Sequence, residues 1–268
     1  MRETFARFIV CFCLLLFPLS ANAEEFSLPG FGDDLFHETI GRNQPGGFQI
    51  VEDPLTNSGG KNVFEFSVVP GPCVEDDCDQ QSARSTVQQG KAKQPKEAWY
   101  GWDMYFPPDF AYGPKQVSGF NIYNEWKDQD NCMLVGLTNF GGWTAPQSGQ
   151  PDMNLSWRMQ NSQLPGDCPI VLQKPIASFD ELLGKWNRFE AFIRWSKKKD
   201  GKVQIYLDGK LKLDYDGVTC FANCNKKMYY LFGHYICCTE DTENIVASKV
   251  YYKNISRSKE RSGLQWKD

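Results

Sequence analysis

The chain has 268 residues and a formal net charge of −4, from 33 acidic and 29 basic residues. A mildly acidic protein has no general attraction for nucleic acid, so we expect no nucleic-acid partner. Residues 1–23 begin with basic residues, continue as an apolar run and end in Ala21-Asn22-Ala23, the pattern of a secretory signal cleaved after Ala23. The apolar run is too short to span a bilayer, and no later segment is long and apolar enough. We expect an exported protein, secreted or periplasmic, with no membrane partner; a retained N-terminal anchor is the alternative.

Residues 24–268 are expected to form a single domain. Their length suits one large β domain, and no proline- or glycine-rich linker and no internal repeat divides them. Loss of the signal removes Arg2, Glu3 and Arg7 and leaves a net charge of −5. We expect the mature protein to be a monomer.

The cysteine content agrees with export. Cys11 and Cys13 lie in the signal, and eight cysteines remain. An even number in an exported chain predicts up to four disulfides, whose pairing the sequence leaves open. Zinc is the competing interpretation, but no histidine stands at ligand spacing, so we expect no metal and no cofactor. The disulfide candidates are Cys73, Cys78, Cys132, Cys168, Cys220, Cys224, Cys237 and Cys238.

Alternating apolar and polar residues recur along the mature chain and predict some eleven strands. The expected strands are 62–69, 83–88, 99–106, 117–127, 133–138, 153–160, 186–195, 202–207, 210–215, 228–236 and 247–255. Asp208-Gly209 signals a hairpin, and the one short helix expected, Ser178–Leu183, ends at Gly184. So many strands with almost no helix predict an all-β fold, a two-sheet sandwich of the jelly-roll, concanavalin-like type with a substrate groove.

Alternation also assigns side chains to faces, because successive residues of a strand point to opposite sides of its sheet. In strand 153–160 we expect the apolar residues to face the core and Arg158 to point the other way. In strand 117–127 the residues expected on the core side are Phe120, Ile122, Asn124 and Trp126. The residues expected on the opposite face are Asn121, Tyr123, Glu125 and Lys127.

The strand 228–236 ends by presenting a tyrosine beyond a glycine. Leu231, Gly233 and Tyr235 share one face, while Phe232 and His234 share the other. We therefore expect His234 to be a buried or hydrogen-bonded structural histidine that does not share a site with Tyr235. In the long glycine-rich connection 138–152, Trp143 either stacks on a sugar ring or pins its loop.

Four segments carry a recognisable pattern: Trp99-Tyr-Gly-Trp-Asp-Met-Tyr-Phe-Pro-Pro-Asp-Phe110, Trp186 to Lys210 with its paired strands and hairpin, Tyr229-Tyr-Leu-Phe-Gly-His-Tyr235, and Val250-Tyr-Tyr-Lys-Asn-Ile255. Together they resemble a secreted polysaccharide lyase superfamily that includes heparin lyase I, glucuronan lyase and alginate lyases. The resemblance implies a jelly roll with a long groove and β-elimination on an acidic, uronate-containing polysaccharide.

The resemblance also implies roles for individual residues. A lyase of this kind needs a group that neutralises the substrate carboxylate, together with a base and an acid. Tyr235 matches the family's catalytic tyrosine, as acid and perhaps base. Arg84 matches its arginine, although Thr86 replaces the usual glutamate. Lys127 stands where the family has a histidine, and Glu125 stands where it has a glutamine.

We expect Tyr235, Lys127 and Arg84 to be catalytic. The residues expected to bind substrate are Asn121, Tyr123, Glu125, Arg158 and Trp143. Because the family histidine is replaced, a non-catalytic carbohydrate-binding protein is the first alternative. The second is a glycoside hydrolase, which needs two carboxylates across the groove, Glu125 with Asp103 or Glu190.

Overall fold

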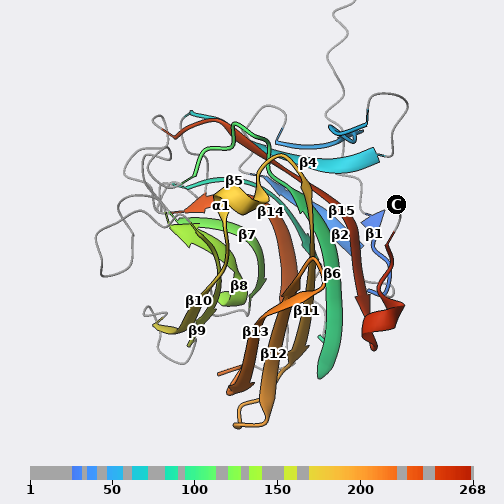
Figure 1. Cartoon of the computed structure of the whole chain (residues 1–268), viewed down its shortest axis with the longest axis vertical. Coiled ribbons are helices and arrows are strands. Elements are labelled where there is room, and N and C mark those ends of the chain that lie inside the picture. The colour runs from blue at the N-terminus through green and yellow to red at the C-terminus, as the bar shows by residue number, and fades with distance from the viewer. Residues whose placement is uncertain are drawn as a thin grey trace, which may run out of the picture.

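The computed structural model describes most of the chain, as two antiparallel sheets that pack against each other (Figure 1). The described residues are 26–31, 35–40, 47–56, 62–71, 82–89, 94–112, 120–127, 133–140, 154–161, 169–221, 228–237 and 245–266. No helix within these ranges has the length and apolar character needed to cross a membrane.

One sheet has eight strands in the order β1-β2-β5-β14-β7-β8-β9-β10. Their bounds are β1 Phe26–Ser27, β2 Leu35–Ile40, β5 Ala83–Gln89, β14 Tyr229–Cys237, β7 Phe120–Lys127, β8 Met133–Phe140, β9 Asn154–Gln160 and β10 Ile170–Ser178. The tyrosine strand β14 therefore lies in the interior of the sheet, between β5 and β7. Such a strand is paired along both edges, which gives its side chains well-fixed positions.

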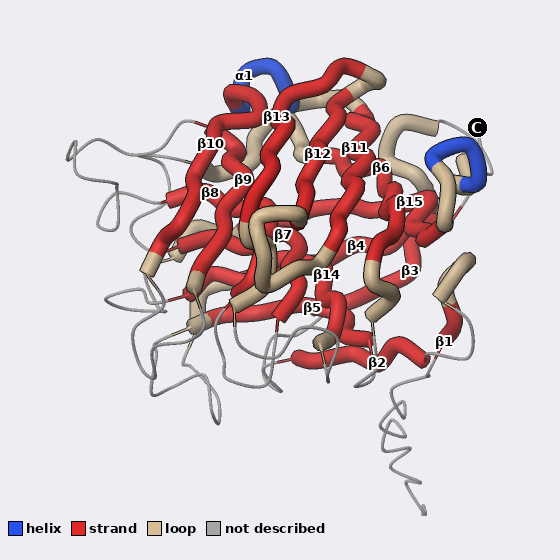
Figure 2. The backbone as a smooth tube through the Cα atoms, turned by 90° about the horizontal axis from the view of Figure 1, so that it is seen from below, coloured by secondary structure: helices blue, strands red, loops and turns tan. Residues whose placement is uncertain are grey.

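The other sheet has seven strands in the order β13-β12-β11-β6-β15-β4-β3. Their bounds are β13 Lys210–Gly217, β12 Gly201–Leu207, β11 Trp186–Arg194, β6 Glu97–Tyr105, β15 Ser248–Ser258, β4 Asn62–Val68 and β3 Phe48–Glu52. Seen from below, the strands of the two sheets stack as two layers (Figure 2). A short helix, α1 (Phe179–Leu182), follows β10, and a 3-10 turn, Arg261–Gly263, follows β15.

The core between the sheets is dominated by aromatic rings. Trp126 from the first sheet packs against Trp102 from the second, with ring centroids 6.4 Å apart, and both side chains are fully buried. Tyr252 reaches across the core and donates one hydroxyl hydrogen, shared between the carbonyls of Tyr123 and Gly233 at 2.7 and 2.9 Å. Burial of this many large rings supplies the main driving force for the sandwich.

The predicted two-sheet sandwich is confirmed, and each of the eleven expected strands is present with its ends shifted by three residues or fewer. Residues 117–119 of one expected strand lie outside the described residues. Four strands, β1, β2, β3 and β10, were missed. The strand β10 contains Pro175, and a proline argues against a strand in a sequence-based prediction. However, β10 is the last strand of its sheet, so a backbone N–H is not needed on its unpaired side.

One expected face assignment is wrong, and a β-bulge is the reason. In the β7–β8 pair, Ile122 is opposite Thr138 and Asn124 is opposite Leu137, so β7 has one extra residue at this point. The bulge reverses the alternation. Ile122 therefore leaves the core side, where it was expected, and Tyr123 takes a place in the core with Trp126.

Candidate functional site

Tyr235 points away from the core. Phe232 is a fully buried member of the main core, so alternation along β14 places Tyr235 on the opposite, outer side of the eight-stranded sheet. Its ring packs with Ile122 and Met133, and its hydroxyl donates a hydrogen bond to Oγ of Ser82 at 3.3 Å. We call this side, marked by Arg84, Glu125, Arg158 and Tyr235, the site face.

Arg84 on β5 is the direct cross-strand partner of Tyr235. Its guanidinium carbon lies 4.4 Å from the centroid of the Tyr235 ring, which is a cation–π contact. The tertiary fold therefore brings together two residues that are 151 positions apart in the sequence. A positive charge fixed beside a tyrosine hydroxyl stabilises negative charge that develops there or on a nearby substrate group.

Glu125 and Lys127 share the site face but lie farther along the strands. On β14, Glu125 is opposite Leu231 and Lys127 is opposite Tyr229, four and six residues before Tyr235. The β14–β7 pairing shifts by one residue between Phe232 and Tyr235, so on β7 itself Glu125 and Lys127 lie three and five residues from Ile122, the partner of Tyr235. At the usual rise of a strand these offsets are about 10 and 17 Å. The structure therefore places Lys127 at a distance along the sheet from the Arg84–Tyr235 pair, and its expected catalytic role stays a prediction.

The Glu125 carboxyl is buried, with 2% of the residue exposed. Burial raises the pKa of this carboxyl, and the positive charges of Lys127 and Arg84 oppose the rise. Within the described residues no hydrogen bond holds the carboxyl. A buried carboxyl in this state favours its neutral, protonated form.

Arg158 on β9 lies in the same cross-strand row as Glu125. Gly136 on β8 is opposite Glu125 on one side and opposite Arg158 on the other. Burial lowers the pKa of Arg158 to about 10, so the guanidinium remains charged at neutral pH. Thr138, two residues along β8, is fully buried on this face, and its hydroxyl has no hydrogen-bond partner within the described residues.

Asn121 and Tyr123 do not belong to the site face, which corrects their expected role in substrate binding. Tyr123 lies in the main core, where its hydroxyl donates a hydrogen bond to Oδ1 of Asn139 at 2.6 Å. Asn121 is buried, with Oδ1 at 3.3 Å from Nε2 of His234. The bulge at Tyr123 is the physical reason, because period-two alternation fails across an inserted residue.

His234 is the buried structural histidine that the sequence predicted. Its ring stacks on Tyr123 at 5.6 Å between centroids, and Nδ1 lies 3.5 Å from Oγ of Ser248. Burial lowers the pKa of His234 to about 3, so the ring is neutral at physiological pH. It faces the core and is separated from Tyr235 by the sheet, so it takes no part in chemistry on the site face.

Several predicted residues lie outside the described residues or cannot be placed by their side chains. Trp143 lies in the connection 141–153, outside the described part of the chain. The same holds for six of the disulfide candidates, Cys73, Cys78, Cys132, Cys168, Cys224 and Cys238. Their expected roles stay predictions.

The carboxylates proposed as hydrolase partners lie on the other sheet. Asp103 on β6 pairs with Arg188 and accepts a hydrogen bond from Nδ2 of Asn254 at 2.6 Å. Glu190 on β11 forms an ion pair with Arg261. Both alternate with core residues on the outer side of the seven-stranded sheet, so the whole sandwich separates them from Glu125. They cannot flank one glycosidic bond with it, and this pairing was wrong.

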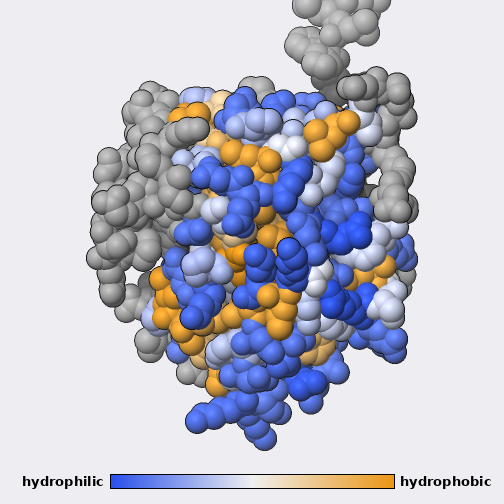
Figure 3. Space-filling view, viewed as in Figure 1, coloured by the Kyte–Doolittle hydropathy of each residue, from blue (hydrophilic) through white to orange (hydrophobic). Residues whose placement is uncertain are grey.

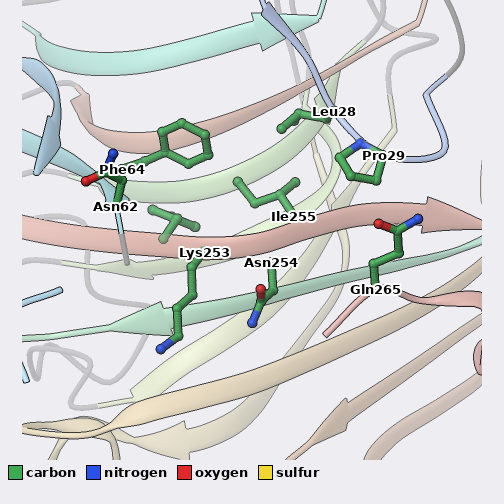
Figure 4. Close-up of a pocket in the computed structure, with 9 residues that line it drawn as sticks. Leu28, Pro29, Asn62, Phe64, Lys253, Asn254, Ile255 and Gln265 are labelled. Atoms are coloured by element: carbon green, nitrogen blue, oxygen red, sulfur yellow. The ribbon is translucent and has the colours of Figure 1, made fainter. Parts of the chain in front are cut away.

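Two pockets elsewhere do not compete as catalytic centres. The first holds about 170 Å³ and is lined mainly by Leu28, Pro29, Phe64 and Ile255. Figure 4 shows Lys253 and its neighbour Asn254 pointing away from Phe64. Their polar ends are engaged by carboxylates, in the case of Lys253 by Asp53 at 2.9 Å.

The second pocket holds about 320 Å³ between Ser67, Phe110, Ser248 and Lys249. Its lysine, Lys249, is paired with Glu65 at 2.8 Å. No arginine is among the described residues that line either pocket.

On the face seen in Figure 3, apolar side chains lie in a band between polar and charged ones, so this face is mixed in character.

Sequence reasoning missed Gly136, Thr138 and Ser82 as parts of the site face. The signal for the first two was available, since Gly136 and Thr138 alternate with the apolar residues Val135 and Leu137. Ser82 comes just before β5, and only the tertiary fold places it within reach of the Tyr235 hydroxyl. The face thus offers a tyrosine hydroxyl, fixed positive charge and a buried carboxyl whose pKa is raised by burial, groups suited to proton transfer next to a carboxylate.

A family model for polysaccharide lyases matches residues 32–256. The chain therefore belongs to the polysaccharide lyase family. The match includes β2 to β14 in full and most of β15, and with them the whole site face.

One solved structure supports the fold. The chain is similar to an endo-β-1,4-glucuronan lyase from the fungus Trichoderma reesei, with 15% identity, 81% of this chain and 89% of that chain covered, and a TM-score of 0.57. It is also similar to the alginate lyase AlgAT5 of polysaccharide lyase family 7 (13% identity, 78% and 84% covered, TM-score 0.48) and to the alginate lyase Aly36B (14%, 72% and 79%, 0.46). No curated protein matches the sequence.

Proposed function

We propose that this polysaccharide lyase cleaves a uronate-containing polysaccharide by β-elimination on the site face, with Arg84 and Tyr235 at the reacting centre. The observation that carries the proposal is the contact of the Arg84 guanidinium with the Tyr235 ring on the outer side of an interior strand. The printed name of a similar structure, an endo-β-1,4-glucuronan lyase, supports a uronate as substrate.

In the proposed reaction Tyr235 exchanges one proton. For this step Tyr235 must be ionised: the phenolate oxygen takes the proton from the ring carbon that bears the carboxylate, and the O–H formed in this way then gives that proton to the glycosidic oxygen as it leaves, which restores the phenolate. The carbon–oxygen bond to the leaving sugar breaks, and a carbon–carbon double bond forms in the uronate ring. Arg84 neutralises the carboxylate, which stabilises the carbanion-like state between these two proton transfers.

The test is incubation with a panel of uronate polymers, followed through the ultraviolet absorbance of the unsaturated uronic product. Absorbance that grows together with new reducing ends supports elimination. Reducing ends without absorbance would mean hydrolysis. Binding without either would favour the carbohydrate-binding alternative, in which the same face holds a polymer but leaves it intact.

We also propose export as a monomer with disulfides. The signal-like residues 1–23 and the even cysteine count support export. Cys220 is fully buried and disulfide-bonded, which agrees with an oxidising compartment.

A further inference from the structure

We propose that Tyr252 is a positioning residue for the elimination reaction, because its hydroxyl holds a β-bulge in β14 that sets the place of Tyr235 against β7. The inference rests on the proposed function and extends it to a side chain that does not touch substrate. Tyr252 is fully buried on β15, in the seven-stranded sheet, whereas Tyr235 lies on the outer side of the eight-stranded sheet. Tyr252 therefore acts through the thickness of the sandwich.

The bulge is defined by the pairing of β14 with β7. Two residues of β14, Gly233 and His234, are opposite one residue of β7, Tyr123. Beyond them the pairing resumes with Tyr235 opposite Ile122, while the pairing of β14 with β5 is continuous through the same stretch. An extra residue in one strand bends that strand and redirects the side chains that follow. Tyr235 is the first residue after the bulge, so the bulge sets its direction relative to β7.

The hydroxyl of Tyr252 joins the two strands at the bulge. Its oxygen lies 2.7 Å from the carbonyl oxygen of Tyr123 on β7 and 2.9 Å from that of Gly233 on β14. A bulge takes backbone groups out of the regular ladder, and buried carbonyls then need a donor from elsewhere. The bulge is therefore held from the core side by a side chain of the other sheet.

The backbone at the bulge is also confined on the side of β5. Gly233 has a φ of 140°, a conformation that residues with a side chain rarely adopt. A Cβ there would lie 2.4 Å from the carbonyl oxygen of Ser85 and 2.7 Å from Cα of Thr86. With β5 on one side and the Tyr252 hydroxyl on the other, this part of β14 has one position. Without the hydroxyl, the bulge can shift while the pairing on either side of it persists.

The ring of Tyr252 is itself held in place by aromatic neighbours. It packs edge-on against Phe66, with centroids 5.5 Å apart, and lies 5.6 Å from the ring of Phe232. Burial raises the pKa of Tyr252 well above 10, so its hydroxyl is protonated and able to donate at neutral pH. A fixed donor matters for the rate, because a shift of about 1 Å in a reacting group can lower the rate about a hundredfold.

The test is Tyr252→Phe, which keeps the ring and removes the hydroxyl. Elimination on a polymer of β-1,4-linked glucuronic acid is followed through product absorbance, at a temperature at which circular dichroism shows each variant folded. We expect kcat to fall about tenfold to a hundredfold while KM stays within about twofold of its value in the unmodified protein. A purely structural role would lower stability but leave kcat of the folded protein unchanged.

Tyr100→Phe is the matched control. Tyr100 is a buried tyrosine of the same sheet, but its hydroxyl donates to Oε1 of Gln94 at 3.0 Å, an acceptor outside the bulge. The control loses one buried hydrogen bond, as Tyr252→Phe does, and should keep kcat within about twofold of the unmodified value.

A double-mutant cycle shows whether Tyr252 acts through Tyr235. In a Tyr235→Phe background the reacting hydroxyl is absent, so its position no longer affects the rate. Adding Tyr252→Phe to that background should lower the residual rate by less than about twofold.

Where Tyr252→Phe does not fold, Phe66→Leu takes its place in the test. It loosens the ring of Tyr252 but keeps the hydroxyl, so we expect kcat to fall about twofold to tenfold with KM unchanged. Phe36→Leu is its control, since Phe36 and Phe66 are both fully buried and both pack on Phe232.

An unchanged kcat in Tyr252→Phe, or a loss of equal size with and without the Tyr235 hydroxyl, would overturn this inference while elimination on uronates still stood. Equal losses of kcat in Phe66→Leu and Phe36→Leu would overturn it as well. If the unmodified protein cleaves no uronate polymer, the proposed function fails, and the inference that rests on it fails too.

Discussion

The guanidinium of Arg84 and the ring of Tyr235 are 4.4 Å apart, and the two residues face each other across the β5–β14 pair. The contact is made with the face of the ring, so it holds the arginine charge near the tyrosine without occupying the hydroxyl. The hydroxyl donates its hydrogen bond to Ser82. A substrate carboxylate that pairs with this guanidinium is therefore brought close to the group that moves the proton. Position and charge are supplied by the same pair of residues.

Replacement of Tyr235 by phenylalanine tests the proton transfer directly. The change keeps the ring, its packing with Ile122 and the stacked Arg84, and removes one hydroxyl. We expect elimination to fall by ~10²–10⁴ with binding and folding nearly unchanged. Initial rates on the best uronate polymer, with circular dichroism for folding, measure this. Tyr206→Phe on the other sheet is the matched control. Full activity in Tyr235→Phe would remove Tyr235 from the mechanism.

Arg84 and Lys127 should behave differently because the structure separates them. Arg84→Ala removes a positive charge at the reacting centre, so we expect kcat on acidic polymers to fall. The fall in kcat/KM should correspond to a loss of ~1.5–3 kcal/mol in transition-state stabilisation. Lys127 lies about 17 Å along the strand, so Lys127→Ala should raise KM for long polymers while leaving kcat near normal. Steady-state kinetics on long and short substrates distinguishes the two. Equal effects on kcat would place Lys127 at the reacting centre after all.

The face of β14 could be predicted from sequence, whereas the face of β7 could not. Against β5 the pairing is continuous through Tyr235, so its separation from His234 followed from period two, although the pairing with β7 shifts by one residue between Phe232 and Tyr235. In β7 one extra residue at Tyr123 reverses the pattern, and nothing in the local sequence marks a bulge there. Asn121 and Tyr123 were therefore assigned to the wrong side, although Glu125 and Lys127, beyond the bulge, were assigned correctly.

Contacts between distant segments were the other part that the sequence could not supply. Arg84 and Tyr235 were each singled out from a motif, but their pairing depends on the strand order β5-β14-β7, which local patterns do not encode. The buried state of Glu125 has the same origin. A charged residue on an outward face reads as solvated, and only the folded sheet shows that this carboxyl is covered and lacks a hydrogen bond.

Gly136→Ala should destabilise the fold. The new Cβ would lie 2.5 Å from the Asn124 carbonyl oxygen, a backbone atom that cannot move without disturbing the β7–β8 pair. We expect a loss of about 1–3 kcal/mol in the free energy of unfolding, as for other overpacked buried sites. Urea denaturation measures the loss. Gly71→Ala is the control, since a Cβ there meets no atom within 4 Å, and it should change stability by less than about 0.5 kcal/mol.

The exported protein should begin at Glu24 and contain no free thiol. Ala21-Asn22-Ala23 sets the expected cleavage point, and the eight remaining cysteines allow complete pairing. Intact mass before and after reduction and alkylation measures both properties. Alkylation of all eight cysteines only after reduction is the expected result. Two or more thiols that react without reductant would contradict the full set of disulfides.

Acid should destabilise the protein through His234. Burial lowers the pKa of this histidine from 6.5 to about 3 in the folded state. Between these two values the unfolded chain binds a proton that the folded protein excludes. The contribution of His234 to stability is therefore complete above pH 6.5 and is lost as the pH falls toward 3.

The measurement is the free energy of unfolding in urea at a series of pH values across this window, for the unmodified protein and for His234→Gln. Glutamine keeps a polar group near Asn121 but does not titrate. We expect the difference in slope between the two proteins to approach one proton, ~1.4 kcal/mol per pH unit, in the middle of the window. The carboxyl groups of the protein titrate in both proteins, so their contributions to the slope cancel in the comparison. Parallel curves for the two proteins would show that His234 accepts a proton in the folded state, contrary to its burial against Tyr123 and Phe110.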